Sequence, residues 1–419
     1  GQSAMNWPQG SYTSYAIFCL NALVGSIDAP GGILYQEHPG YKALPPLVED
    51  AIARKGRTQP FLDLRGTEKF IHAKTVTNQI PESILRKTPY PVEMAIGFNC
   101  NFNMSAPGPQ RWDEALKKIS YYVHLSPFIS EMALYADLLL PTTTYLEEWG
   151  YDDPPPGSGF AEARIKQPVV KPYGEAKSPV DVLFSFAKTM GGSVGKSFEH
   201  LGKDSEEWAM LRTSTLIPWE EFQKRGVWIG SDYRYRKYER IFHTPSKKFE
   251  FISGNLRSSL AKMGTRKTEE VDYLPHYKEA LFLGDKEKYP LLLHPYSPLM
   301  AFENGSQNYP WAQEIFLPMH GIGWDTLVEI NSETGKTLKL RDGQTVWVES
   351  PFQKIKARVK FSEGLHPEVV SIPQGQGHYS YGKWQRGVGV NPNEIIGVDY
   401  DPISGQAAFF NTRVKVYKA

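Results

Sequence analysis

Apolar residues in the first half of the chain form short runs separated by amphipathic stretches. Residues 92–97 (VEMAIG) and 121–125 (YYVHL) have the pattern of strands, and residues 138–140 (LLL, stopped by a proline) that of a buried strand. Residues 111–119 (RWDEALKKI) and a turn around Met132 fit helices between them. Strands and helices that alternate at this spacing predict an α/β fold with a parallel sheet.

Other segments have less regular patterns. Residues 14–24 (SYAIFCLNALV) predict a mostly buried helix, and residues 180–190 (VDVLFSFAKTM) an amphipathic helix. Residues 36–90, rich in proline and lysine, predict a long surface excursion with some helix. Residues 151–159 (YDDPPPGSG) are expected to lack regular structure, and residues 244–251 (TPSKKFEF) to form an edge strand.

The last third changes to short strands and turns. Asn331 is expected to cap a short helix that ends near Leu338, and residues 341–343 (RDG) give a hairpin-type turn signal. Several short strands separated by turn signals predict a small β-barrel. The domains are therefore expected to be an α/β domain at 1–195, a mixed connecting region at 196–285 and a barrel at 286–419. The six expected strands are residues 291–294, 327–330, 345–350, 354–361, 369–372 and 412–417.

Composition restricts the partners and metal centres. The net charge of the 419 residues is +1, with acids and bases interspersed, so it gives no argument for nucleic-acid or membrane binding. Cys19 and Cys100, the only cysteines, exclude a disulfide framework and an iron–sulfur cluster bound by the chain's own cysteines. No run reaches about 18 apolar residues, so no spanning helix is expected. The start, GQSAMNWPQG, lacks a basic and apolar leader, so we expect a signal peptide to be absent or already removed.

Polar residues follow two of the predicted strands. Residues 142–150 (TTTYLEEWG) come after the third strand, and residues 98–109, with three asparagines, after the first. In open α/β sheets, ligands bind beyond the carboxyl ends of the strands. Plainer explanations stay open, because a loop asparagine is usually a turn residue, and Glu131 is equally explained as a helix N-terminal acid stabilised by the dipole.

Several segments together resemble one family. Residues 130–150 (SEMALYADLLLPTTTYLEEWG) resemble the hallmark segment of the molybdopterin oxidoreductases, the dimethyl sulfoxide reductase family. Residues 21–32 (NALVGSIDAPGG), 172–177 (PYGEAK), 244–250 (TPSKKFE) and 389–404 (GVNPNEIIGVDYDPIS) are similar to further segments in the family's order. The likeness covers most of the chain. It implies a parallel sheet domain followed by a six-stranded type of β-barrel, and a molybdenum or tungsten ion held by two pterin guanine dinucleotides.

The resemblance also implies cofactor contacts. Amides and backbone groups can recognise a pterin, a flat heterocycle with many donors and acceptors, and phosphates need N–H groups. Ser126 is placed at the guanine end, where many members have an acid, so serine is a departure. We name no catalytic residue and no metal ligand. The implied contacts are Asn6, Asn99, Asn101, Ser126 and Glu148 in the α/β part, and His294, Pro295, Tyr296, Ser297, Asn304, Asn308, Asn393, Phe410 and Asn411 in the barrel part.

Two family features have no counterpart here: the upstream cysteine cluster for a 4Fe-4S centre and the protein ligand of the metal. We therefore expect these residues to be the carboxyl-terminal part of a longer catalytic subunit, or a subunit paired with a separate amino-terminal half. The iron–sulfur cluster would then lie in that half or in a partner.

The resemblance points to a respiratory reductase of a sulfur or arsenic oxyanion or polysulfide. Such enzymes imply an iron–sulfur electron-transfer subunit, a membrane anchor subunit and a periplasmic or otherwise extracytoplasmic location, associated with the membrane through these partners. The alternatives are a cofactor-less structural subunit of an electron-transfer complex and an isolated nucleotide-binding module.

Overall fold

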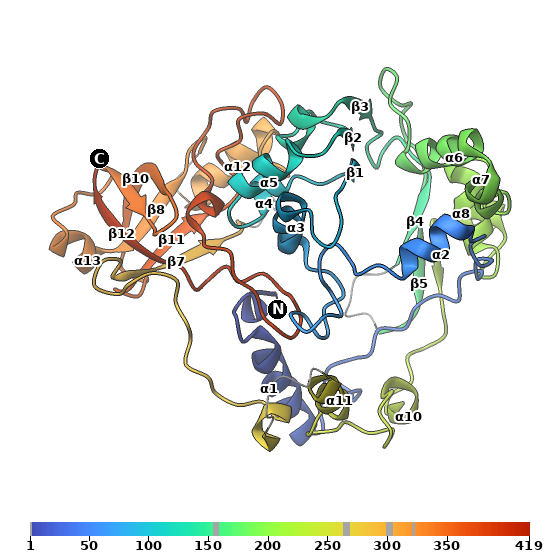
Figure 1. Cartoon of the computed structure of the whole chain (residues 1–419), viewed down its shortest axis with the longest axis horizontal. Coiled ribbons are helices and arrows are strands. Elements are labelled where there is room, and N and C mark those ends of the chain that lie inside the picture. The colour runs from blue at the N-terminus through green and yellow to red at the C-terminus, as the bar shows by residue number, and fades with distance from the viewer. Residues whose placement is uncertain (1, 154–158, 263–268, 299–304, 321–322) are drawn as a thin grey trace.

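A three-stranded parallel sheet, in the order β1-β2-β3, organises the first half of the chain (Figure 1). The computed structural model describes residues 2–153, 159–262, 269–298, 305–320 and 323–419. The parallel α/β sheet is confirmed, and each of its strands begins and ends within two residues of its expected position. The expected burial of the third strand is wrong, because Leu138 is 38% exposed and the two leucines after it are only partly buried. The elements are β1 (Met94–Phe98), α5 (Gln110–Leu116), β2 (Tyr121–Ser126), η3 (Met132–Tyr135) and β3 (Leu138–Pro141).

The two faces of this sheet pack against different elements, because successive side chains along a strand point to opposite faces. Tyr122 belongs to an apolar cluster with Trp112 of α5. Val123, the next residue, packs on the other face with Val182 of helix α6 (Pro179–Met190). Helix α6 therefore covers one face of the sheet over β2 and β3.

The last third of the chain forms a closed barrel of six strands in the order β10-β8-β11-β7-β12-β9. Its interior is filled by apolar side chains, among them Val328, Val346 and Val370, which are fully buried. The predicted barrel is confirmed. Its strands are β7 (Leu291–Tyr296), β8 (Leu327–Asn331), β9 (Thr345–Glu349), β10 (Lys354–Ser362), β11 (Val369–Pro373) and β12 (Arg413–Lys418).

Two local signals in the barrel have clear physical causes. The Asn331 side chain accepts a 2.9 Å hydrogen bond from the N–H of Glu333, so it caps α13 (Ser332–Thr337) as expected. Gly343 has φ +76°, which glycine adopts without strain, and its N–H donates to the carbonyl of Val359. This turn connects α13 to β9 rather than two paired strands, so the hairpin interpretation of residues 341–343 is wrong.

A second, antiparallel sheet has the order β4-β5-β6. Its strands are β4 (Gly150–Asp152), β5 (Glu162–Lys166) and β6 (Val227–Ile229). The expectation that residues 151–159 lack regular structure is therefore wrong for the first two of them, because these pair with β5. Residues 154–158 lie outside the described part of the chain.

Helix α1 (Gly10–Leu23) forms where a helix was predicted, but the expectation that it is mostly buried is wrong. Cys19 is buried, whereas Leu20 and Leu23 are 64% and 71% exposed. The helix is held from one side, where the Tyr15 hydroxyl donates to the carbonyl of Phe251 at 2.7 Å. Its apolar residues on the other sides therefore face solvent.

Residues 244–251 form no strand, which corrects the predicted edge strand. The Thr244 hydroxyl donates to the carbonyl of Lys248, and the Ser246 hydroxyl donates to the carboxylate of Glu250. These local bonds satisfy the segment within itself and favour turns over ladder pairing.

Residues 36–90 are more than a surface excursion. Phe70 and Val76 are each 1% exposed. The ring of Tyr400, from the segment before β12, lies 5.3 Å from the ring of Phe70, and its hydroxyl donates to the carbonyl of Asn78. The carboxyl-terminal half of this segment is therefore packed against the barrel domain.

Most helices are short, and several of them lie at the periphery of the molecule. In Figure 1 the barrel lies at the left, α6 to α8 lie at the right, and α1, α10 and α11 lie at the bottom. No helix in the described ranges is long and apolar enough to cross a membrane. The remaining helices are η1 (Gln2–Met5), α2 (Ala51–Arg57), η2 (Thr77–Gln79), α3 (Ile80–Arg86), α4 (Phe102–Ser105), α7 (Gly192–Phe198), α8 (Ser205–Thr213), α9 (Trp219–Arg225), α10 (Tyr238–Ile241), α11 (Gly254–Lys262), η4 (Glu270–Tyr273), α12 (Pro310–His320) and η6 (Pro392–Ile395).

Candidate cofactor site

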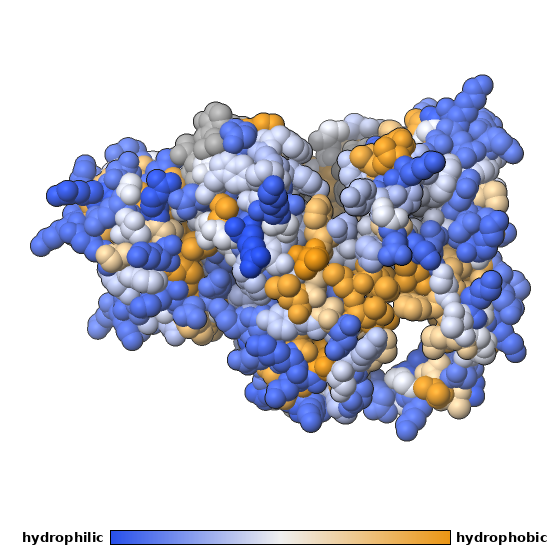
Figure 2. Space-filling view, turned by 90° about the horizontal axis from the view of Figure 1, so that it is seen from above, coloured by the Kyte–Doolittle hydropathy of each residue, from blue (hydrophilic) through white to orange (hydrophobic). Residues whose placement is uncertain are grey.

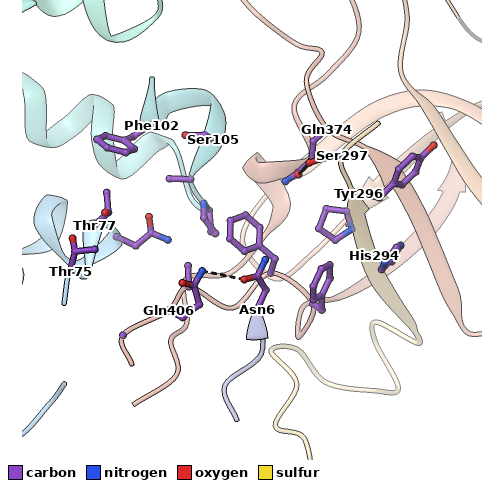
Figure 3. Close-up of a pocket in the computed structure, with 18 residues that line it drawn as sticks. Asn6, Thr75, Thr77, Phe102, Ser105, His294, Tyr296, Ser297, Gln374 and Gln406 are labelled. Atoms are coloured by element: carbon purple, nitrogen blue, oxygen red, sulfur yellow. Dashed lines mark hydrogen bonds between the residues drawn. The ribbon is translucent and has the colours of Figure 1, made fainter. Parts of the chain in front are cut away.

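A cavity of about 610 Å³ lies where the α/β domain meets the barrel domain. In Figure 3, Thr75, Thr77, Phe102 and Ser105 form one wall, and His294, Tyr296, Ser297 and Gln374 form the other, with Asn6 and Gln406 between them. Its volume is in the range of small-molecule and cofactor sites. The complete lining is Asn6, Thr75, Thr77, Asn78, Phe102, Ser105, Ala106, Pro107, His294, Pro295, Tyr296, Ser297, Gln374, Gly405, Gln406, Ala407, Phe409 and Phe410.

The barrel wall presents stacked rings. The ring of His294 lies 5.4 Å from the ring of Phe410 at an interplanar angle of 20°, and it is also nearly parallel to the ring of Tyr296. Burial lowers the pKa of His294 and raises the pKa of Tyr296 to about 12. Both side chains are therefore neutral near pH 7 and offer flat faces and hydrogen-bonding edges.

Asn6 and Gln406 close the cavity between the two walls. The Gln406 amide donates to the side-chain oxygen of Asn6 at 3.1 Å, as drawn in Figure 3. The carbonyl of Asn6 accepts a 2.9 Å bond from the N–H of Phe409. The amino-terminal turn is thereby held against the segment that leads into the last barrel strand.

No Asp, Glu, Lys or Arg lines this cavity, among the side chains that the structure describes. Its polar groups are amides of asparagine and glutamine and hydroxyls of serine and threonine, which can both donate and accept. Aromatic rings supply the rest of the surface. This set of groups fits a large, flat, neutral heterocycle with a mixed donor and acceptor edge, which is the character of a pterin.

Six of the predicted contacts lie together in this cavity: Asn6, His294, Pro295, Tyr296, Ser297 and Phe410. The structure brings together residues that are about 400 positions apart in the sequence. Their role in binding a cofactor stays a prediction. Asn304, a further predicted contact, lies outside the described residues.

Three other predicted contacts lie at the carboxyl edge of the parallel sheet. Asn99 follows β1, is exposed, and has φ +43°, with its N–H donating to the carbonyl of Leu125. Ser126 ends β2. The Asn101 amide donates to Glu131 at 2.7 Å, and its oxygen accepts from a backbone N–H at 3.4 Å. Asn99 therefore has the more accessible amide of the two.

Glu148 lies beyond β3 in a different cavity of about 550 Å³. Its carboxylate accepts a 2.7 Å bond from the hydroxyl of Thr143. This second cavity is also lined by Lys177 and Asp181, so it is charged where the first is neutral. The structure does not bring Glu148 together with the barrel residues in one cavity.

Asn308, Asn393 and Asn411, the remaining predicted contacts, are bonded within the protein. Asn393 is fully buried and donates from its amide to the carbonyl of Met104 at 2.5 Å. The side-chain oxygen of Asn308 accepts from a backbone N–H, and the Asn411 amide donates to Asp399 at 2.7 Å. The Asn393 bond joins the two domains, whereas the side-chain oxygen of Asn411 is buried without a partner.

Glu131 links the two domains, which the sequence analysis did not predict. It is fully buried, and its carboxylate accepts bonds from Asn101, from the N–H groups of Tyr379 and Ser380, and from His378. Burial raises the pKa of Glu131, but its hydrogen bonds and the charge of His378 outweigh this and hold the pKa below its ordinary value. The helix-dipole explanation for this acid is therefore insufficient.

Other cavity residues were also missed. Thr75, Thr77 and Asn78 lie in the segment that was interpreted as a surface excursion, and Gln406 follows an unremarkable turn. One signal was available for Gln374, since it lies two residues beyond the predicted strand at 369–372. Within the described part of the chain, no group of three or more His, Cys, Asp or Glu side chains could hold a metal ion.

Comparisons with known proteins give the family context. The model described as molybdopterin oxidoreductase matches residues 1–189, and the model described as Molydopterin dinucleotide binding domain matches residues 311–413. The molybdopterin-containing subunit of the arsenate respiratory reductase of Shewanella sp. (strain ANA-3) is 30% identical over 100% of this chain and 56% of its own length. That of the thiosulfate reductase of Salmonella typhimurium is 24% identical over 86% of this chain and 49% of its own length.

A solved structure shares the fold. Acetylene hydratase from Pelobacter acetylenicus matches with a TM-score of 0.63 and 22% identity, over 86% of this chain and 50% of that one. This chain spans about half the length of the curated relatives that it matches.

Proposed function

Because this chain belongs to the molybdopterin oxidoreductase family, we propose that it supplies cofactor-binding walls of a respiratory reductase that acts on an arsenic or sulfur oxyanion or polysulfide. The observation that carries the proposal is the neutral cavity of about 610 Å³ between the two domains. It collects residues from both segments that match the family, together with the end of barrel strand β7, which lies between them in the sequence.

The chemistry of this cavity fits one pterin of the cofactor. Asn6 and Gln406 would contact the donor and acceptor edge of the heterocycle, and the His294 and Phe410 rings would pack on its face. The Ser105 and Ser297 hydroxyls would donate to phosphate oxygens. When bound, the cofactor supplies a molybdenum or tungsten centre that exchanges electrons, and oxygen atoms, with the substrate. The chain itself binds and orients the cofactor.

The remaining parts of the enzyme belong to the same proposal. The amino-terminal half would carry the protein ligand of the metal, and a 4Fe-4S cluster would lie in that half or in a partner. An iron–sulfur electron-transfer subunit and a membrane anchor subunit would connect the enzyme to respiration from a periplasmic or extracytoplasmic position. The relatives named as reductases of arsenate and thiosulfate support this choice of chemistry.

Substrate assays on the intact enzyme test the function. The purified enzyme is supplied with a reduced viologen dye and with arsenate, thiosulfate, tetrathionate or polysulfide in turn. We expect dye oxidation that depends on one of these acceptors. A metal-loaded enzyme that oxidises the dye with none of them would overturn the substrate class. An intact protein without metal and pterin would favour the cofactor-less structural subunit instead.

A further inference from the structure

Strand β1 has a free edge. Its five residues pair in parallel with β2, and no other strand in the described ranges pairs with it. Peptide groups along a strand point alternately to its two sides, so about half of the N–H and C=O groups of β1 point away from β2. Such an edge is a template for one more strand.

One face of β1 is also bare. Met94, Ile96 and Phe98 occupy alternate positions, so they share a face, and they are 53%, 48% and 51% exposed. Their neighbour on the same face of β2, Val123, is 1% exposed because α6 covers it. Leu125, beside Phe98, is likewise buried at 2%, whereas Tyr121, beside Met94, is 44% exposed. The cover therefore stops between β2 and β1 at the level of Ile96 and Phe98, and it does not reach the start of β2.

Such exposure is unusual for the edge strand of a complete sheet. Parallel sheets are normally covered on both faces, and exposed edge strands usually carry charges, prolines or bulges that block further pairing. The sequence of β1, MAIGF, contains no charge and no proline. Figure 2 shows apolar colour gathered in the middle of the molecule, between the barrel at the left and the α6 to α8 helices at the right.

We propose that the edge and bare face of β1 bind a strand–helix unit from the rest of the intact subunit. Its strand would pair in parallel with β1, and its helix would pack on Met94, Ile96 and Phe98 beside α6. The helix follows from the geometry, because parallel neighbours need a crossover connection that lies on a face of the sheet. The side chains of this unit that contact Met94, Ile96 and Phe98 must be apolar and uncharged.

The length of the relatives supports this occupant. They extend well beyond the part that this chain matches, so they contain polypeptide that could supply the unit. A second copy of this chain would offer the same bare strand and no helix for the face. The inference rests on the proposal that the chain works with an amino-terminal half, but not on the cofactor.

Amide hydrogen exchange of the intact subunit tests the edge, read by mass spectrometry on peptides that span β1 and β2. Because β2 is paired on both sides, it is the internal reference. We expect the amides of β1 to exchange as slowly as those of β2. Exchange in β1 at least about ten-fold faster than in β2 overturns the proposal. Protection that depends on protein concentration also overturns it, since it would identify a second copy as the occupant.

A matched pair of variants tests the face. Ile96→Lys places a charge under the expected helix, and Ile229→Lys places the same charge on an edge strand of the other sheet at a similar exposure of 52%. We expect Ile96→Lys to speed exchange in β1 at least about ten-fold and Ile229→Lys to leave it unchanged. An intact Ile96→Lys subunit with unaltered β1 exchange contradicts the proposal. If this variant does not fold, the wild-type exchange alone decides.

The same samples separate this inference from the proposed function. Protected β1 amides in an intact subunit that lacks metal and pterin support the docking surface and overturn the cofactor proposal. Unprotected β1 amides in a metal-loaded subunit support the cofactor proposal and overturn the docking surface.

Discussion

A carboxylate oxygen of Glu131 lies 3.1 Å from Nδ1 of His378, and both side chains are fully buried. Glu131 follows the central strand of the parallel sheet, and His378 follows barrel strand β11. The contact therefore fastens the two domains that form the walls of the candidate cofactor site. Two backbone N–H groups and the Asn101 amide complete the environment of the carboxylate.

Replacing Glu131 should loosen this link. Glu131→Gln keeps the shape but removes the charge and turns an amide N–H₂ group toward donors, and breaking a buried pair typically costs about 3–5 kcal/mol. We expect the free energy of unfolding to fall by about 3 kcal/mol, measured in urea by tryptophan fluorescence.

The matched control is Glu221→Gln in α9, which loses an exposed ion pair with Arg225. Its effect should stay within about 0.5 kcal/mol. Equal losses of stability in the two variants would show that the buried contact does not hold the domains together.

His124 should make stability depend on pH. It is fully buried between the Tyr122 hydroxyl and Ser130, and burial lowers its pKa from 6.5 to about 4. Between these values the unfolded chain takes up a proton that the folded protein does not. Stability should therefore fall as the pH drops, by up to about 1.4 kcal/mol per pH unit and about 3 kcal/mol in all.

Urea unfolding at pH 7 and at pH 4.5 checks this in the wild type and in His124→Gln. The wild type should lose more stability across this interval than the variant, which lacks the titrating ring. The exposed His200→Gln serves as the control and should behave like the wild type. A pH dependence that His124→Gln leaves unchanged would rule out His124 as its source.

Local patterns in the sequence predicted the regular elements well. Alternation in residues 354–361 reflects burial on one face of β10, which is what such a pattern records. The apolar runs of the parallel sheet predicted the positions of its strands but not their burial, since Ile96 of β1 and Leu138 of β3 are 48% and 38% exposed. The exposure of Leu20 and Leu23 on α1 was not predictable in this way, because an apolar helix looks the same whether or not a partner covers it. Strand β4 at residues 150–152 was not predicted, because the prolines that follow it indicated an irregular segment.

Asn99→Gly tests the predicted contact at the sheet edge. Asn99 has φ +43°, which glycine tolerates, so the substitution removes the amide without straining the backbone. We expect a lower molybdenum or tungsten content in the intact subunit, with a melting temperature within about 3 °C of the wild type.

The control is Lys87→Gly, since Lys87 has φ +54° and lies outside the candidate site. It should keep full metal content. If Asn99→Gly also retains the wild-type metal content, its amide does not contact the cofactor.

Gln406→Leu tests a contact that the sequence did not predict. Gln406 is exposed and donates to Asn6 in the cavity, so its loss should weaken cofactor binding with little effect on folding. We expect a several-fold loss of bound pterin, measured by fluorescence after acid release. Gln59→Leu, at an exposed position outside the cavity, should lose none. The same pterin content in both variants would remove Gln406 from the site.

The candidate site was only partly predictable, for a physical reason. Asn6, His294 and Phe410 came from a resemblance of separate segments, whereas their meeting with Thr75 and Gln406 depends on how two domains pack. Packing between domains leaves no local periodicity. The link between Glu131 and His378 was hidden in the same way, because its partners are 247 residues apart.

Metal and pterin analysis of the intact subunit, purified without oxygen, tests the central claim most directly. If the chain forms walls of a bis-pterin site, each subunit should contain about one molybdenum or tungsten atom and about two pterins, with guanine nucleotide released by acid. An intact, folded subunit that contains neither metal nor pterin would contradict the account.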